Sequence, residues 1–271
     1  MIDIPRILAG LALSTLIGAA AYHRRSLTRS GWLGAILTGT LTFGFGGWTW
    51  GGTLIAFFLS SSVLTQVKQQ RKQQLAGEKF EKGGQRDFSQ TMANGGVGAL
   101  LALLYGLTGE PALLALFTGV MATVTADTWA TELGVLARGE PRLITTLRPV
   151  APGTSGGVSA AGMLASAAGA LLIGGSVLLL FRIEHGVWLS GIVVVALIGG
   201  VAGSLADSLL GATVQAIYRD VHGNETERAF DHHGRALVQL RGWRWMTNDF
   251  VNALSSVAGG LIALGLERIF M

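Results

Sequence analysis

The sequence predicts an all-α integral membrane protein, a polytopic bundle of about eight transmembrane helices that forms one domain over residues 1–271. Its composition is 50% hydrophobic and only 13% charged, whereas soluble domains carry about 25% charged residues. Its apolar runs are repeatedly long enough to cross a bilayer. Its 40 glycines suit close helix packing in lipid, where small residues let backbones approach.

The apolar runs define the expected helices. The first has the hydrophobicity of a signal peptide, but its basic cluster follows the apolar run instead of preceding it, so we expect a retained helix. The second and third are short and rich in glycine. The expected spans are 4–21, 31–46, 51–66, 92–108, 112–136, 157–180, 188–213 and 248–268.

The basic residues test this count of spans. Seventeen of the 20 Lys and Arg lie in four connecting segments, 22–30, 67–91, 137–156 and 214–247. Eight spans place all four segments on one side of the membrane. Because positive loops stay in the cytoplasm, we expect these segments to be cytoplasmic, with both termini outside a bacterial-type inner membrane.

Three of the carboxylates in the apolar spans carry the functional prediction. Asp127 and Glu132 fall in the fifth span and Asp207 in the seventh, all near the expected cytoplasmic end. Each costs about 2.5–3.5 kcal/mol to insert, so such residues are functional by default. We expect Asp127 and Asp207 to bind Mg²⁺ and all three to be catalytic, with structural contacts between helices as the alternative. Asp127 and Glu132 do not share a face of a regular helix, so that helix is broken or Glu132 has a different partner.

Further polar residues gather at the same expected depth. A glycine run before the sixth span could bind a polyphosphate through its amides, or it could be a plain turn. Basic residues beside it and in the segment 67–91 could be counter-charges, Lys79 and Lys82 among them. The expected substrate-binding and nucleotide-binding residues are Asn94, Arg86, Arg148, Gly153, Thr154, Ser155, Gly156, Gly157, Asn248, Asp249 and Asn252. For the asparagines, hydrogen bonds between helices are the alternative.

Two other groups need no function. Trp32, Trp48, Trp50 and Trp188 fall where interfacial aromatic belts are expected. The segment 220–234 holds Asp220, His222, His232 and His233 among its possible metal ligands, and we interpret it as a solvated polar loop because only the spacing suggests a metal.

Five motifs in this order resemble the phytyl-phosphate kinase family of membrane proteins, from about residue 30 to the end. They are 85–96, which includes Gln90 and Asn94; 127–134, with Asp127, Thr128, Trp129 and Glu132; 153–158; 203–212, with Gly203, Ser204 and Asp207; and 248–252. One departure is that some bacterial relatives carry cysteine pairs in the loop corresponding to 219–234, where this chain has none.

The resemblance implies a kinase that converts an isoprenoid monophosphate, phytyl phosphate or a similar one, to its diphosphate. It implies a nucleoside triphosphate donor, with CTP expected, and a role in tocopherol and quinone synthesis. Two alternatives remain open at this point. The first is a CTP-dependent polyprenol or phytol kinase or a lipid-phosphate cytidylyltransferase, and a kinase of free alcohols would need Glu132 as base. The second is a lipid-phosphate transporter or flippase. No nucleic-acid partner is expected.

Overall fold

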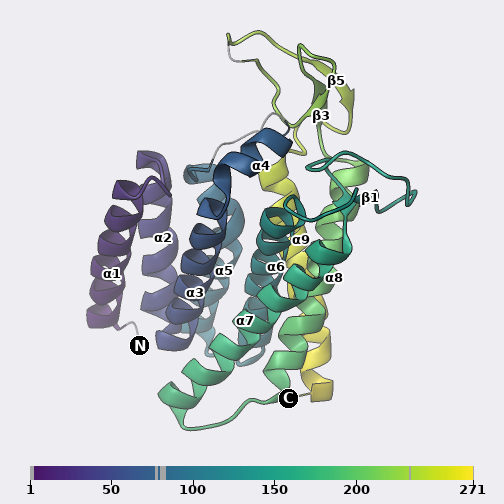
Figure 1. Ribbon diagram of the computed structural model, residues 1–271. Helices are drawn as coiled ribbons and strands as arrows, with labels where there is room; N and C mark the ends of the chain where they lie inside the picture. The colour runs from purple at the N-terminus through teal and green to yellow at the C-terminus, as the bar shows by residue number, and fades with distance from the viewer. Residues whose placement is uncertain (1–2, 77–78, 80–83, 232, 271) are drawn as a thin grey trace.

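The computed structural model describes residues 3–76, 79, 84–231 and 233–270, so Lys82 and His232 lie outside the described residues. Long helices fill most of this part of the chain (Figure 1). They are α1 (Ile4–His23), α2 (Arg29–Gly46), α3 (Trp48–Gln66), α5 (Phe88–Thr108), α6 (Ala112–Gly134), α7 (Ala160–His185), α8 (Gly191–Thr213) and α9 (Asn248–Phe270). Each coincides with one expected span, which confirms a polytopic helical membrane protein.

Not every long helix qualifies as a candidate membrane span. Within the described residues, six helices are long and apolar enough to cross a bilayer: α1, α5, α6, α7, α8 and α9. A seventh span results if α3 and the short α4 (Gln69–Ala76) form one span bent by 74°. Helix α2, which begins at Arg29 and is rich in glycine and threonine, is not among these helices. Length and composition thus support six or seven spans, against the eight expected.

Capping residues explain where the helices begin and end. Asp87 caps α5, because its carboxylate accepts a hydrogen bond from the amide of Gln90 at 2.9 Å. This cap starts the helix four residues before the expected span. Ser159 caps α7 in the same way through the amide of Gly162. Gly186, at φ +76°, ends α7 in the left-handed conformation that favours glycine.

Helix α6 is the centre of the bundle. It packs against α3, α5, α7, α8 and α9. In its most apolar window 67% of the residues are buried, against no more than 39% in the other five candidate spans. Glycines permit this packing, since a Cβ atom at Gly203 or Gly259 would lie 2.1 Å or less from the hydroxyl of Thr123. The backbones of α8 and α9 therefore approach α6 as closely as the glycine content predicted.

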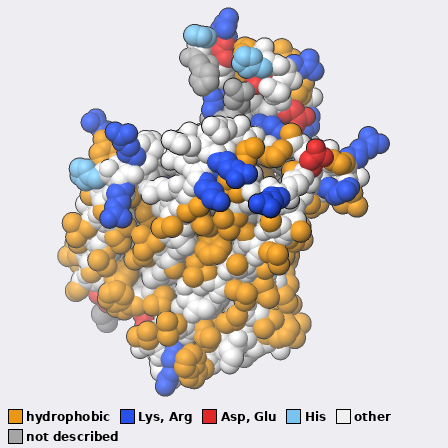
Figure 2. All heavy atoms as spheres, in the orientation of Figure 1, with side chains coloured by type: hydrophobic (Ala, Val, Ile, Leu, Met, Phe, Trp, Pro, Cys, Tyr) orange, Lys and Arg blue, Asp and Glu red, His pale blue; other side chains and the backbone are white. Residues whose placement is uncertain are grey.

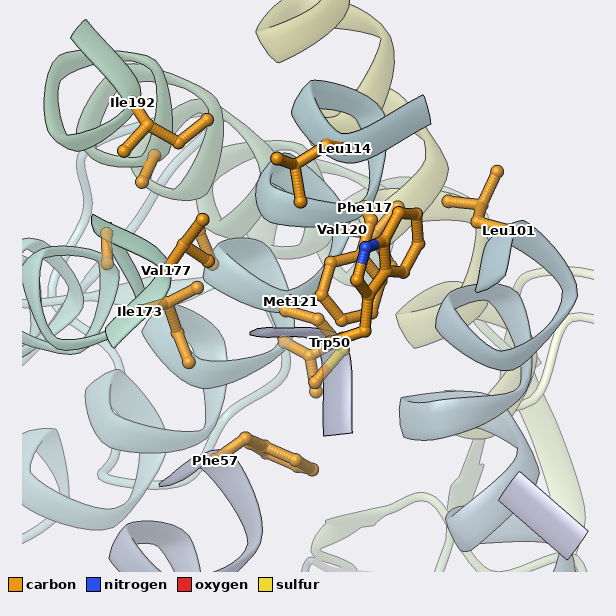
Figure 3. Close-up of a cluster of buried hydrophobic side chains, with 14 of the residues drawn as sticks. Trp50, Phe57, Leu101, Leu114, Phe117, Val120, Met121, Ile173, Val177 and Ile192 are labelled. Carbon is orange, nitrogen blue, oxygen red and sulfur yellow. The ribbon is translucent and has the colours of Figure 1, made fainter. Parts of the chain in front are cut away.

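A cluster of large side chains fills the core beside α6 (Figure 3). Trp50 of α3 is 2% exposed, and its ring centroid lies 4.3 Å from that of Phe117 in α6. The expectation that Trp50 belongs to an interfacial belt is therefore wrong. Trp48 and Trp188 are more than half exposed, as belt residues should be.

The four basic segments lie at one end of the bundle, and both termini lie at the other (Figure 1). Figure 2 shows Lys and Arg gathered at that end, beyond a broad apolar band. Short strands form there in two antiparallel sheets. One pairs β1 (Arg142–Leu143) with β2 (Gly157–Val158), and the other has the order β4 (Glu225–Thr226), β3 (Ile217–Arg219), β5 (Val238–Arg241). We call this the basic end.

Candidate active site

A polar cavity of about 580 Å³ lies at the basic end of the bundle. It is lined by α3 to α9 and by the segment between α6 and α7, so it collects residues that are far apart in the sequence. The lining contains all but one of the predicted site residues: Arg86, Asn94, Asp127, Glu132, Gly153, Thr154, Ser155, Gly156, Gly157, Asp207, Asn248, Asp249 and Asn252.

Asp127 and Asp207 form the acidic part of the cavity. Asp127 of α6 is hydrogen-bonded to the hydroxyl of Ser204 on α8, and it lies within electrostatic reach of Asp207 and Glu227. Asp207 accepts a hydrogen bond from the hydroxyl of Ser255 on α9 at 2.9 Å. These hydroxyls hold both carboxylates toward the same space. Carboxylates this close repel each other, so a cation between them would be stabilised.

The acidic residues do not make a complete metal cage. Among the described residues, no group of three or more His, Cys, Asp or Glu side chains is placed to hold a metal ion. Mg²⁺ is commonly bound by only one or two carboxylates, with water and substrate phosphates as its remaining ligands. Asp127 and Asp207 fit a site of this type, in which two carboxylates bind an ion that a phosphate ligand also binds.

Glu132 has partners other than Asp127. Its two carboxylate oxygens accept hydrogen bonds from the hydroxyl of Thr65 at 2.6 Å and from the ammonium of Lys72 at 2.5 Å. Helix α6 continues unbroken to Gly134. Of the two possibilities left by the five-residue spacing, the structure therefore shows a different partner. Glu132 joins the centre of the bundle to α4, whose residues Gln69 and Gln73 also line the cavity.

The glycine run lies against α8. Gly153 and Gly156 have φ of +76° and +82°, a conformation that favours glycine. A Cβ atom at Gly156 would lie 2.5 Å from that of Ala212. The run does not lead directly into α7, as the sequence suggested, because β2 and the capping residue Ser159 intervene. These two glycines are therefore required for the fold of the loop as well as for any ligand.

Part of the glycine run already uses its polar groups. The amides of Thr154 and Gly157 donate hydrogen bonds within the loop, so they do not point freely into the cavity. The hydroxyl of Thr154 accepts a hydrogen bond from the ammonium of Lys79 at 3.0 Å. Lys79 is thus held beside the run, and loss of solvent lowers the pKa of Lys79 while the nearby Glu225 opposes that change. A cation placed this way suits an anionic ligand.

Arg148 is the predicted site residue that the structure does not bring to the cavity. It lies in the connection between β1 and β2, is exposed, and its carbonyl accepts a hydrogen bond from the amide of Leu143. Proximity to the glycine run in sequence suggested a phosphate contact, but Arg148 is not among the residues that line the cavity.

Arg86 lies at the inner wall of the cavity. Its guanidinium lies 5.8 Å from the ring centroids of both Phe57 and Phe58, and it donates a hydrogen bond to the hydroxyl of Ser62 at 3.2 Å. Loss of solvent lowers the pKa of Arg86, and the nearby Glu132 opposes this change. An arginine remains charged under such conditions, so Arg86 places a fixed positive charge at the cavity.

Helix termini add to this positive potential. Helices α5, α7 and α9 all begin at the basic end, and residues of their first turns line the cavity: Gln90, Ser159, Gly162, Asn248, Asp249 and Asn252. The amino-terminal end of a helix carries a partial positive charge and favours bound anions. The cavity therefore combines a neighbouring pair of aspartates with several features that favour bound anions.

Sequence reasoning did not assign Lys72, Gln90, Glu227 and Arg228 to the site, although all four line the cavity. Gln69, Lys72 and Gln73 are spaced as neighbours on one helix face, and this spacing was a usable signal. Within the described residues the buried Oε1 of Gln90 has no hydrogen-bond partner. For Glu227 and Arg228 no local pattern pointed to the cavity, because the fold of the loop brings them there.

The loop 220–234 uses its carboxylates for turns. Asp220 accepts hydrogen bonds from the amides of His222 and Asn224, and Asp231 accepts them from His233 and Arg235. These bonds lower the pKa of Asp231, the amide of Arg235 contributing most.

The chain is similar to known membrane proteins over most of its length. Residues 12–260 match the family model described as integral membrane protein DUF92. The chain is 38% identical to Protein PGR of Arabidopsis thaliana over 78% of this chain and 79% of that protein. It is 25% identical to the chloroplastic Protein VTE6 of the same plant, over 90% of this chain and 66% of that protein.

An uncharacterized membrane protein of Methanocaldococcus jannaschii is 28% identical over 96% of this chain and 93% of its own length. No solved structure matches the chain. The family match and these relatives confirm the relationship that the motifs predicted, and the chain belongs to the integral membrane protein family DUF92.

Proposed function

We propose that this protein is a kinase that phosphorylates an isoprenoid monophosphate to the diphosphate, with a nucleoside triphosphate, CTP in our expectation, as donor. The observation that carries this proposal is the pairing of Asp127 and Asp207 in a polar cavity that also holds Arg86 and the glycine run. The five motifs and the similarity to Protein VTE6, chloroplastic, support an enzyme of this kind.

The proposed chemistry relies on positioning and charge neutralisation. The acceptor phosphate is already an anion near neutral pH, so one of its oxygens would attack the terminal phosphorus of the donor without a strong base. The bond from that phosphorus to the bridging oxygen of the donor would break, and the nucleoside diphosphate would leave. Asp127 and Asp207 would hold Mg²⁺, which supplies positive charge to the donor phosphates when bound. Arg86 and Asn94 would bind the acceptor, and Asn248 and Asn252 would orient phosphate oxygens. Such preorganised groups account for most of the acceleration in phosphoryl transfer.

The donor polyphosphate is assigned to the other side of the cavity. There Thr154 and Lys79 are hydrogen-bonded to each other beside the glycine run. The amino terminus of α7 adds a positive dipole end close to this group. With the donor on this side and the acceptor near Arg86, the transferred phosphoryl group passes close to Asp127 and Asp207.

The contacts of Glu132 favour a phosphate acceptor over a free alcohol. A kinase of prenols or phytol needs a base to remove the hydroxyl proton, and the sequence offered Glu132 for this role. Both oxygens of Glu132 are occupied by Thr65 and Lys72. A carboxylate whose two oxygens both have partners within the protein is not placed to take a proton from a substrate hydroxyl, which supports the monophosphate as substrate.

A transporter needs polar groups at the opposite end of the bundle as well. Glu184 is one of the acidic residues there, and its carboxylate accepts hydrogen bonds from the amides of Trp48 and Thr49 at the start of α3. This contact gives Glu184 a structural role as a helix cap. The contrast between the two ends supports a site that meets a cytoplasmic reagent.

Product analysis tests the proposal. Purified protein in detergent is incubated with Mg²⁺, each of four nucleoside triphosphates, and either geranylgeranyl monophosphate or geranylgeraniol. We expect geranylgeranyl diphosphate from the monophosphate, with CTP the best donor, and no phosphorylation of the alcohol. Phosphorylation of the alcohol alone would assign the activity to a prenol kinase, and a cytidylylated lipid would assign it to a nucleotidyltransferase.

A further inference from the structure

A second cavity, which is apolar, lies between α1, α2, α3 and α5, next to the polar cavity. Its volume is about 80 Å³. Glycines and apolar side chains form most of its lining, including Leu13, Ile17, Phe43, Leu54, Phe57 and Phe58. We call it the apolar cleft. It requires an explanation of its own because none of these six residues lines the polar cavity.

The two cavities share a boundary. Arg86 and Asn94 line both of them. The guanidinium of Arg86 lies over the rings of Phe57 and Phe58, which are walls of the apolar cleft, and its positive charge adjoins the polar cavity. A ligand that occupies both spaces must therefore carry an anionic group joined to a hydrocarbon chain.

The apolar cleft runs along the helices toward the membrane interior. On α1 it extends from Gly10 to Gly18, and on α2 from Ala35 to Phe43. Eight residues of helix correspond to about 12 Å. Helix α1 packs mainly against α2, and only 22% of its most apolar window is buried. One wall of the cleft is therefore a peripheral, lipid-facing helix, past which a hydrocarbon chain can enter from the bilayer.

We propose that the apolar cleft binds the part of the isoprenoid tail nearest the acceptor phosphate, with that phosphate at Arg86 and Asn94. This inference rests on the proposed function. It assigns the lipid substrate to the amino-terminal helices α1, α2, α3 and α5. It leaves the segments around Asp127, Asp207 and the glycine run for metal and donor.

A matched pair of substitutions in α1 tests the assignment. Ile17 lines the cleft, whereas its neighbour Leu16 is 68% exposed on the lipid-facing surface. Ile17→Trp fills the cleft, so we expect KM for geranylgeranyl monophosphate to rise at least tenfold. KM for the nucleotide, whose phosphates are assigned to the opposite side of the polar cavity, should not change. Leu16→Trp should leave both KM values unchanged. An unchanged KM for geranylgeranyl monophosphate in Ile17→Trp would overturn the assignment.

Binding can be measured without turnover. A geranylgeranyl monophosphate analogue with a diazirine on its first isoprene unit is photo-crosslinked to the full protein, and the labelled peptides are identified by mass spectrometry. We expect label on α1, α2, α3 or α5 that unlabelled geranylgeranyl monophosphate competes away and phosphatidylcholine does not.

Two results of the crosslinking would refute the cleft. Label on α7, α8 or α9 would place the tail elsewhere, and competition by phosphatidylcholine would show that the cleft holds ordinary bilayer lipid. If the expected label appears but no nucleotide yields a diphosphate, the cleft stands as a prenyl-phosphate site and the proposed kinase activity fails.

Discussion

The contacts of Glu132 lead to a prediction that distinguishes two roles for this residue. As a tether it attaches α4 to α6 through Lys72, and as a general base it takes a proton from the substrate. The Lys72 and Glu132 side chains are 11% and 18% exposed. The burial of this ion pair is intermediate between two known cases. An exposed ion pair stabilises a protein by about 0–1 kcal/mol, and breaking a buried one costs about 3–5 kcal/mol. We expect Glu132→Gln to weaken the attachment of α4 by about 2 kcal/mol, because one charged hydrogen bond is lost and the ammonium of Lys72 keeps only the carbonyl of Leu64.

A change of about 2 kcal/mol raises the population of detached α4 by about 30-fold. Hydrogen exchange of the α4 amides should report it as faster exchange in Glu132→Gln and in Lys72→Met. If Glu132 is a tether, both variants should lose activity to a similar, moderate extent, and the double variant should be little worse than either single one. If Glu132 is a base, Glu132→Gln should be inactive while Lys72→Met works, and that outcome would refute the tether.

Three further predictions concern the metal, the loop and the topology. Asp127→Asn and Asp207→Asn should each reduce kcat by about 10³-fold or more, a loss of transition-state stabilisation on the order of 4 kcal/mol, with an unchanged melting temperature in detergent. Near-normal turnover of either variant would show that the substituted aspartate is not part of the catalytic site. Gly156→Ala should destabilise the protein by about 2 kcal/mol or more, because φ is +82° and Ala212 leaves no room for a Cβ atom; an unchanged melting temperature would contradict this packing. Cysteines placed singly in the four basic segments should resist an impermeant thiol reagent added outside intact cells, the positions being Arg29, Lys79, Arg142 and Arg235. Labelling of any one of these cysteines from outside would contradict the cytoplasmic assignment.

Most of the fold and much of the candidate site could be predicted because lipid imposes simple rules. Each carboxylate within an apolar run is costly, so Asp127 and Asp207 were conspicuous, and the four basic segments fixed the direction of every helix. Directions fix depth, and depth alone predicted that Asn94 and Asn252 would lie near the aspartates. The structure brings these residues to one cavity.

What could not be predicted depends on tertiary contacts. Trp50 looks interfacial by its place in the sequence, but Phe117 and Tyr105 of two other helices bury it. Arg148 is close to the glycine run in the chain, but it lies exposed in the connection between two paired strands and does not line the cavity. Lys72 looked like one more basic loop residue, and only the bend between α3 and α4 brings it to Glu132.

The fate of the donor's terminal phosphate tests whether phosphoryl transfer to a prenyl monophosphate occurs at Asp127 and Asp207. Purified protein with Mg²⁺, geranylgeranyl monophosphate and CTP labelled at the γ-phosphate should yield labelled geranylgeranyl diphosphate, and Asp207→Asn should yield none above background. Labelled diphosphate formed equally by Asp207→Asn, or a parent protein that transfers no label from any nucleoside triphosphate, would contradict the account.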